Sequence, residues 1–192
     1  MKKKIFVFLF DGFSDWEIAY VSPEIKKSDT FDLIYFSKDG KPVQSMGGLQ
    51  VLPQIALAEI QVDDIEMLIL PGGIPWEKGE NTEIDPLVET LFAAGKTIAA
   101  ICAATTYLGR HGFLNNLKHT SNYPEYLKML APGYSGENYY INSLAVTDEN
   151  IITACGIAPV EFAREIFVKL KLYSEIYTEK WFQLFKNGIW CE

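Results

Sequence analysis

The sequence is poor in residues that ligate metals or pair as disulfides. Its 192 residues include two histidines, His111 and His119, and three cysteines, Cys102, Cys155 and Cys191. The histidines are dispersed and no CxxC pair occurs, so no metal-ligand spacing is recognisable, and an odd cysteine count argues against a secreted disulfide framework. No GxGxxG motif follows the first predicted strand, which excludes the usual dinucleotide site. We therefore predict neither a metal nor a cofactor.

Positive charge is also in short supply. Seventeen Lys and Arg residues stand against 25 Asp and Glu residues, giving a formal net charge of −8 and a pI near 4.9. Such a surface repels phosphate backbones and anionic lipid. Nucleic acid and membrane are therefore not predicted partners.

Long apolar runs are missing as well. Only six apolar residues, from Ile5 to Phe10, precede Asp11, which is short of the roughly 7–15 of a secretory signal, and no small-residue cleavage pattern follows. No other segment approaches the roughly 18 apolar residues of a membrane helix. We predict that residues 5–10 form a buried strand and that the protein is cytoplasmic.

What the sequence does have is apolar material, with 48% hydrophobic and 14% aromatic residues. This is enough for a sizeable core in one domain spanning residues 1–192. Apolar runs of strand length alternate with segments of helical spacing, and continuous apolar strands are typical of a parallel sheet covered by helices on both faces. The pattern predicts an α/β fold with strands over residues 5–10, 33–36, 67–70 and 98–101.

Helical spacing and turn residues predict the remaining elements. Pro23 limits or kinks the first helix, and Gly95 ends the second. The last helix carries an apolar stripe, for which we predict core packing, with a dimer contact as the alternative. The predicted helices cover residues 15–27, 86–94, 159–172 and 174–185, and the stripe consists of Ile176, Trp181, Leu184 and Phe185.

Two β-hairpins are predicted outside the main strands. The first spans residues 43–53 and turns at Gly47-Gly48, which suggests a hairpin appended to the sheet. The second spans residues 139–154 and turns at residues 148–150. Its predicted role is to extend the sheet.

Cys102 is the most informative single residue. The buried strand ends at this cysteine, and a helix of small residues begins directly after it. The thiol would therefore lie at the carboxyl edge of the sheet, beside free N–H groups that stabilise a thiolate or an oxyanion. This is the logic of a nucleophile elbow. The alternative is that Cys102 is a small buried hydrophobe.

Four stretches together resemble the DJ-1/PfpI superfamily, which is related to class I glutamine amidotransferase domains. They are FDGFSDWE at 10–17, LILPGG at 68–73, AAICA at 99–103, and DENIITACG at 148–156 followed by Glu161-Phe162-Ala163. The resemblance covers residues 1–172. It implies a flavodoxin-like three-layer α/β sandwich with a mostly parallel central sheet, small β-hairpin extensions and a C-terminal helical tail over 173–192.

The same resemblance implies roles for individual residues. Cys102 corresponds to the reactive cysteine, and Glu17 to an acid that contacts its sulfur. A protonated Glu17 would donate a hydrogen bond to a thiolate, whereas an ionised Glu17 would raise the pKa of the thiol. The backbone N–H groups of Gly73 and Ala103 would form the oxyanion site.

Departures from the family pattern bear on the reaction. Peptidase-like members carry a histidine directly after the nucleophile, where this chain has Ala103. In DJ-1 a histidine lies in the loop after the nucleophile helix, where this chain has Asn122, with His119 three positions earlier. His119 could swing toward the pocket, whereas His111 is expected to cap carbonyls or face solvent. A Cys/His/acid triad and peptidase activity are therefore disfavoured.

Other residues are weaker candidates for the site. Asp15 would replace Glu17 as the acid if the register were shifted by two. Trp76 and Glu77 are expected on a loop at the same carboxyl edge of the sheet as Cys102. They are predicted either to line a substrate pocket or, as the alternative, to pack on the surface. The further candidates are Asn122 and Tyr123 as pocket lining, Cys155 as core filling, and Cys191 as an exposed residue unrelated to function.

Three functions remain open from the sequence. The first is a cysteine-dependent hydrolase, lyase or glyoxalase-like enzyme acting on a small electrophilic substrate. The second is a redox or electrophile sensor in which Cys102 is oxidised to a sulfinic acid. The third is a catalytically inert binding domain. The resemblance also implies a homodimer.

Overall fold

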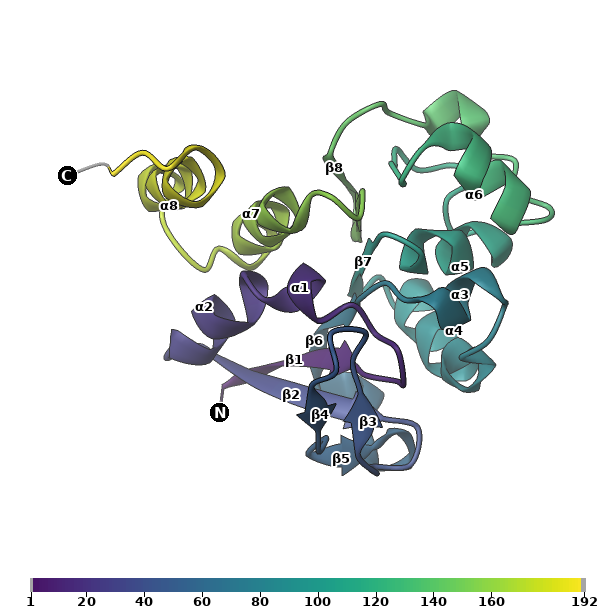
Figure 1. Ribbon diagram of the computed structural model, residues 1–192, viewed down its shortest axis with the longest axis horizontal. Helices are drawn as coiled ribbons and strands as arrows, with labels where there is room; N and C mark the ends of the chain where they lie inside the picture. The colour runs from purple at the N-terminus through teal and green to yellow at the C-terminus, as the bar shows by residue number, and fades with distance from the viewer. Residues whose placement is uncertain (1, 191–192) are drawn as a thin grey trace.

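A seven-stranded sheet runs through the centre of the computed structural model, which describes residues 2–190 (Figure 1). Its spatial order is β5-β2-β1-β6-β7-β9-β8, and all neighbours are parallel except β8 and β9. The central strands β2-β1-β6-β7-β9 follow the flavodoxin-like order. The strands are β1 (Lys3–Phe8), β2 (Phe31–Ser37), β5 (Ile55–Ala56), β6 (Ile65–Leu70), β7 (Thr97–Ile101), β8 (Ala145–Asp148) and β9 (Ile151–Ala154).

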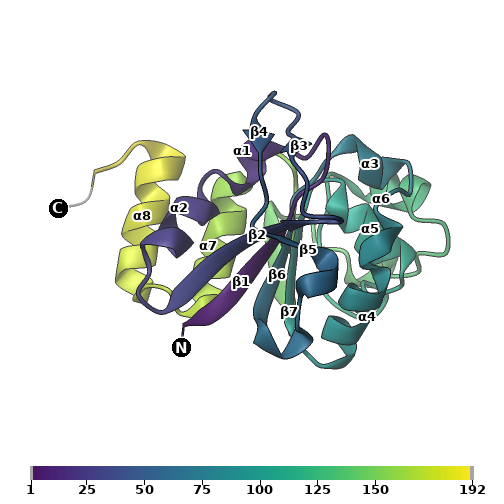
Figure 2. The same ribbon diagram turned by 90° about the horizontal axis from the view of Figure 1, so that it is seen from below.

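Helices cover both faces of the sheet. One layer contains α1 (Asp15–Ile18), α2 (Val21–Lys27) and α7 (Pro159–Leu170), and the other contains α3 (Ile74–Glu77), α4 (Asp85–Ala93), α5 (Ala104–Arg110) and α6 (Pro124–Leu130) (Figure 2). Outside α7 lies α8 (Glu175–Asn187). Short 3-10 helices are η1 (Leu57–Glu59), η2 (Val62–Asp64), η3 (Thr82–Ile84) and η4 (Glu137–Tyr139). Within residues 2–190, no helix has the length and apolar character to cross a bilayer.

Burial of the central strands explains this layered arrangement. Every residue of β7 is buried, as are five of the six residues of β6. A strand whose two faces are both buried needs helices above and below it, and its apolar run is continuous rather than alternating. The flavodoxin-like α/β sandwich expected from the sequence is thus confirmed.

The predicted first helix is divided in the structure. It splits into α1 and α2 at Ala19 and Tyr20, before the proline that was expected to limit it. Pro23 lies in the first turn of α2, where a missing N–H group costs no helical hydrogen bond. The break leaves α1 as a short segment that carries Glu17.

Both predicted hairpins form, with corrected extents. Strands β3 (Val43–Gln44) and β4 (Gln50–Val51) pair with each other in a separate two-stranded sheet rather than with the main sheet. In the second hairpin, β8 extends the sheet as its antiparallel edge and turns into β9 through Glu149, which has φ of 47°. Residues 139–144, which were predicted as β-structure, contain no strand.

The stripe on α8 does not pack as one surface. Trp181 is only 5% exposed, and its ring lies 4.7 Å from that of Phe167 on α7. Ile176, by contrast, is 74% exposed, so the predicted core packing holds for one part of the stripe and not for the other. The helix begins after Ser174, whose side-chain oxygen accepts a hydrogen bond from the Tyr177 N–H. Cys191 lies outside the described residues.

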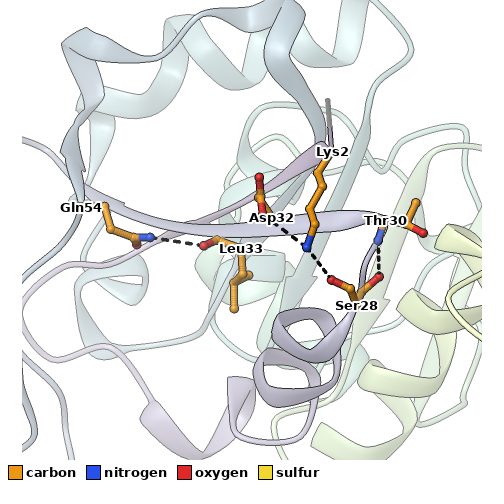
Figure 3. Close-up of polar contacts among 6 residues, drawn as sticks. All are labelled: Lys2, Ser28, Thr30, Asp32, Leu33 and Gln54. Carbon is orange, nitrogen blue, oxygen red and sulfur yellow. Dashed lines mark hydrogen bonds and ion pairs between the residues drawn. The ribbon is translucent and has the colours of Figure 1, made fainter.

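Hydrogen bonds and an ion pair stabilise the start of β2, as Figure 3 shows. The Lys2 ammonium donates to the Ser28 carbonyl at 2.9 Å and lies 3.9 Å from the Asp32 carboxylate. Ser28 Oγ accepts from the Thr30 N–H at 3.0 Å, which closes the turn between α2 and β2. Gln54 Nε2 donates to the Leu33 carbonyl at 3.3 Å and ties the chain before β5 to this strand.

Trp181 and Ile176 provide a test of how α8 is held. We expect Trp181→Ala to lower the free energy of unfolding by about 3–5 kcal/mol, because it removes a buried indole from the α7–α8 contact. Ile176→Ala on the same helix is the matched control and should change stability by less than about 0.5 kcal/mol. Urea unfolding monitored by circular dichroism measures both. Equal effects of the two substitutions would contradict the described packing.

Candidate active site

Three chain segments meet at the carboxyl ends of the central strands. Glu17 lies on α1 after β1, Gly72 follows β6, and Cys102 follows β7. The strand order reverses between β1 and β6, and open α/β sheets bind ligands beside such a reversal. Glu17 is fully buried and Cys102 is half-buried.

Cys102 occupies a strained turn between β7 and α5. Its φ is 58°, in the left-handed region that costs a residue with a side chain roughly 1–2 kcal/mol. Two hydrogen bonds hold the turn: the Cys102 N–H donates to the Ala154 carbonyl at 2.9 Å, and Thr105 Oγ1 donates to the Cys102 carbonyl at 2.6 Å. This geometry matches the elbow expected from the strand-to-helix transition.

Glycines allow the backbone to press against Cys102. A Cβ atom at Gly72 would lie 2.7 Å from Cys102 Cβ and 2.7 Å from Glu17 Oε2. A Cβ atom at Gly156 would lie 2.6 Å from Cys102 Sγ. Neither position has room for a side chain, so both glycines are required by close approach.

Glu17 is held between Gly72 and Cys102. Its Oε2 atom accepts a hydrogen bond of 2.6 Å from the Gly72 N–H, whereas Oε1 is buried without a well-formed partner among the described residues. Burial raises the pKa of Glu17 from 4.5 to about 7, opposed by hydrogen bonding with Gly72, Cys102 and Ser14. A carboxyl group with this pKa can both accept and donate a proton at neutral pH.

The Cys102 thiol is perturbed in the direction opposite to the one expected for an activated elbow cysteine. Burial and the negative charge of Glu17 raise its pKa to about 12, while the Asn122 amide and the Ala103 N–H lower it. Glu17 therefore ionises first, near pH 7, and its carboxylate then lies beside a thiol from which it can take the proton. The two groups act as one acid–base pair.

Asn122 reaches the sulfur from the loop before α6. Its Nδ2 group donates to Cys102 Sγ at 3.6 Å, and its Oδ1 atom accepts from the Gly156 N–H at 2.9 Å. The bond from Gly156 fixes the amide so that its donor end faces the sulfur. Asn122 thus lies where the family resemblance placed a histidine, but it donates a hydrogen bond and cannot act as a base.

Tyr126 was not predicted from the sequence. Its hydroxyl donates to Glu77 Oε1 at 2.8 Å, and burial, with Glu77 and Cys102 nearby, raises its pKa. The same Tyr126 hydroxyl also interacts with Asn122. No local pattern in the sequence could have indicated this contact, because Asn122 lies in the loop before α6 and Tyr126 lies within the helix.

Ser14 was also missed. It is buried at the start of α1, its N–H donates to the Gly72 carbonyl at 2.9 Å, and its side chain interacts with Glu17. Together with the bond from the Gly72 N–H to Glu17, this contact clamps α1 to the loop after β6.

Three predicted site residues serve other contacts. Asp15 Oδ1 accepts from the Gly47 N–H at 3.0 Å, so it holds the β3–β4 hairpin and does not replace Glu17. Trp76 is fully buried, its ring 5.3 Å from that of Phe10, so it belongs to the core rather than to a pocket wall. Tyr123 is half exposed, and its ring lies 5.4 Å from that of Tyr126.

Neither histidine takes part in the site. Both ring nitrogens of His119 are engaged, Nδ1 with the Leu117 carbonyl and Nε2 with the Tyr134 hydroxyl, each at 2.6 Å. His111 ends α5 as expected, its backbone N–H donating to the Tyr107 carbonyl at 3.2 Å, and its half-buried ring lies with Nε2 3.6 Å from Asp85 Oδ1. Among residues 2–190, no three His, Cys, Asp or Glu side chains are grouped to hold a metal ion.

The two amides expected to bind an oxyanion both adjoin the site. The Ala103 N–H interacts with Cys102, and the Gly73 backbone follows Gly72 directly. Within the described chain, neither N–H donates to another backbone carbonyl. The oxyanion role of these two donors stays a prediction.

A flavodoxin-like sheet with a cysteine elbow and a buried carboxyl group at its sulfur defines a class of cysteine-centred α/β proteins. A family model described as the DJ-1/PfpI family matches residues 3–169. The chain belongs to the DJ-1/PfpI family.

Similar proteins carry different activity names. The protein named "Uncharacterized protease YoaZ" of Bacillus subtilis (strain 168) is 37% identical over 96% of this chain and 91% of its own. The crystal structure of a DJ-1 superfamily protein from Agrobacterium tumefaciens has a TM-score of 0.89 at 36% identity, covering 98% of this chain and 99% of that chain. The glutathione-independent glyoxalase DJR-1.2 of Caenorhabditis elegans is 30% identical over 72% of this chain and 73% of its own. These names support an enzyme-like family without specifying one reaction.

Alkylation of Cys102 by iodoacetamide should report the acid–base pair. In the wild type we expect the rate to rise with a midpoint of about 7, as Glu17 becomes able to take the thiol proton. In Glu17→Gln the midpoint should move above the free-thiol value of about 8.5, because burial still disfavours the thiolate and no carboxylate accepts its proton. Peptide mass spectrometry assigns the alkylated site.

Asp15→Asn is the matched control for this experiment, because it removes a carboxylate on the same helix that does not contact Cys102. Its midpoint should equal that of the wild type. An identical midpoint in wild type and Glu17→Gln would contradict the pairing.

Glu17 should also make stability depend on pH. Its pKa is about 7 in the folded chain against 4.5 when unperturbed, so the unfolded chain releases this proton first as pH rises. Stability is therefore fully present below pH 4.5 and is lost as pH rises through 7, by about 3 kcal/mol in total. Glu17→Gln should remove this loss, as urea unfolding at pH 4.5 and pH 8 would show. A constant stability difference between the two proteins would refute the raised pKa.

Proposed function

We propose that the protein is an enzyme that uses Cys102 as a nucleophile toward the carbonyl carbon of a small electrophilic substrate. The observation that carries this proposal is the buried Glu17 carboxyl group, which has a pKa of about 7 and lies beside the Cys102 sulfur. A purely architectural elbow gains nothing from a buried carboxyl group, which costs stability at neutral pH.

The chemistry follows from the positions of the groups. The Glu17 carboxylate takes the thiol proton while Cys102 Sγ bonds to the carbonyl carbon. The negative charge that develops on the substrate oxygen is stabilised by the N–H groups of Ala103 and Gly73. Glu17 then returns the proton to the adduct. Asn122 donates a hydrogen bond to the sulfur and so orients it before attack and after release.

Two features favour a glyoxalase-like reaction over peptide hydrolysis. Both histidines lie outside the site, so no imidazole is positioned to protonate a leaving amine. Glu17 alone can move a proton between neighbouring carbon atoms of a 2-oxoaldehyde adduct, which leaves a hydroxyacyl thioester on Cys102 without loss of an amine. Water then adds to the thioester carbon, the carbon–sulfur bond breaks, and the hydroxy acid and the Cys102 thiol are released. The relative from Caenorhabditis elegans bears the name of a glyoxalase.

Turnover of a 2-oxoaldehyde tests this proposal. We expect wild type to convert methylglyoxal into a hydroxy acid, Cys102→Ser to be inactive, and Glu17→Gln to have kcat lowered by about 10²–10⁴-fold. Cys191→Ser is the matched thiol control and should keep wild-type kcat. Loss of the aldehyde and formation of the acid are followed by chromatography.

Amide and ester substrates should be assayed beside the aldehyde. If none of the three is turned over by protein whose Cys102 still shows the alkylation midpoint near pH 7, the enzymatic proposal fails. Unchanged aldehyde turnover in Cys102→Ser would contradict the assigned nucleophile.

A further inference from the structure

Cys102 and Cys155 directly follow β7 and β9, which are neighbouring strands of the sheet. Ile98 pairs with Ile151, and the Ile98 N–H donates to the carbonyl of the residue before its partner, at 2.9 Å. The Cys102 N–H donates in the same way to the Ala154 carbonyl, also at 2.9 Å. The parallel ladder of β7 and β9 therefore continues one step beyond the strands and makes Cys155 the register partner of Cys102.

This register places the two cysteines side by side at the ends of neighbouring strands. Adjacent strands lie about 5 Å apart, and a disulfide needs Cα atoms about 4.4–6.8 Å apart. One residue contacts both sulfur atoms: the Asn122 side chain donates to Cys102 Sγ at 3.6 Å, and the Cys155 thiol donates to the Asn122 carbonyl at 3.8 Å. Both cysteines are half-buried free thiols.

The chain beside Cys155 approaches Cys102 closely. Gly156, the next residue, has no side chain, and a Cβ atom there would collide with Cys102 Sγ. The Cys155-Gly156 backbone consequently lies against the nucleophile. The bond from Cys155 to the Asn122 carbonyl is a weak thiol contact that costs little to break.

We propose that Cys102 and Cys155 form a two-cysteine redox centre, in which Cys102 reduces a hydroperoxide and Cys155 resolves the product as a disulfide. The proposal rests on the nucleophilicity of Cys102 assigned above and does not depend on the carbonyl reaction. It differs from the sulfinic acid end-state considered from the sequence, because a neighbouring thiol intercepts the first oxidation product.

The reaction balances with the hydroperoxide as the only oxidant. Cys102 Sγ attacks the terminal peroxide oxygen, the O–O bond breaks, and the departing alkoxide takes the proton that Glu17 received from the thiol. This yields an alcohol and the Cys102 sulfenic acid. The Cys155 sulfur then attacks Cys102 Sγ and expels hydroxide, which combines with the Cys155 proton to form water. Two thiols and one hydroperoxide become a disulfide, an alcohol and water.

The disulfide should be reversible. Cys102 is held in a left-handed turn with φ of 58°, so we expect the bond to require a shift of the backbone away from this geometry. Strained disulfides of this kind are readily reduced. While it persists, the bond occupies the Cys102 sulfur and switches off any chemistry that uses it as a nucleophile.

Mass spectrometry after peroxide treatment tests the proposal. Full-length protein is treated with a small excess of hydrogen peroxide, quenched with N-ethylmaleimide and measured intact and as non-reduced peptides. We expect the wild type to lose two hydrogen atoms and two alkylatable thiols, to yield a linked Cys102–Cys155 peptide, and to recover both thiols with dithiothreitol. Cys191→Ser should behave identically.

Cys155→Ser is the decisive variant, because serine keeps the size of the side chain but cannot resolve a sulfenic acid. It should gain two oxygen atoms at Cys102, as a sulfinic acid that dithiothreitol does not reverse. Its Cys102 should keep the alkylation midpoint near pH 7, which shows an intact fold. Wild type that gains oxygen atoms as Cys155→Ser does, or that links Cys102 to Cys191, would overturn the proposal. Neither result would affect the carbonyl turnover assay.

Discussion

The site depends on the contact of three backbone segments at the Cys102 sulfur. Gly72 and Gly156 approach the cysteine so closely that a Cβ atom on either would overlap it. The approach of Gly72 places its N 2.6 Å from Glu17 Oε2. A carboxyl group of the first helix is thereby brought to a thiol that follows β7, the fifth strand from the β5 edge. Parallel strands whose carboxyl ends share one edge make this convergence possible.

Burial gives the site its chemistry at the expense of stability. Removing water raises the pKa of Glu17 to about 7, which suits a group that must accept and return a proton. It also raises the pKa of Cys102, so the thiol depends on its neighbour for activation. The large apolar core, which fills both faces of the sheet, supplies the free energy that keeps an ionisable side chain inside.

The sequence predicted what local pattern determines. The buried strands, the elbow at Cys102 and the glycines after β6 all follow from apolar runs and turn residues, and the family resemblance added Glu17. Contacts between segments that are distant in the sequence do not produce a local sequence pattern. The sequence could not show that the Tyr134 hydroxyl forms a hydrogen bond with the His119 ring or that Asp15 accepts one from the β3–β4 hairpin. Nor could it show that the Trp76 ring packs on Phe10. The pKa of Cys102 was expected in the wrong direction, because burial and the charge of Glu17 raise it and neither can be read from the residues next to the cysteine.

The central claim is that Glu17 is a buried acid coupled to Cys102. The most direct measurement is a carbon-13 NMR titration of the Glu17 side-chain carboxyl, assigned by its absence in Glu17→Gln. The structure predicts a midpoint of about 7, displaced when Cys102 is replaced by serine. A midpoint at the unperturbed value of 4.5, unchanged in Cys102→Ser, would contradict the account.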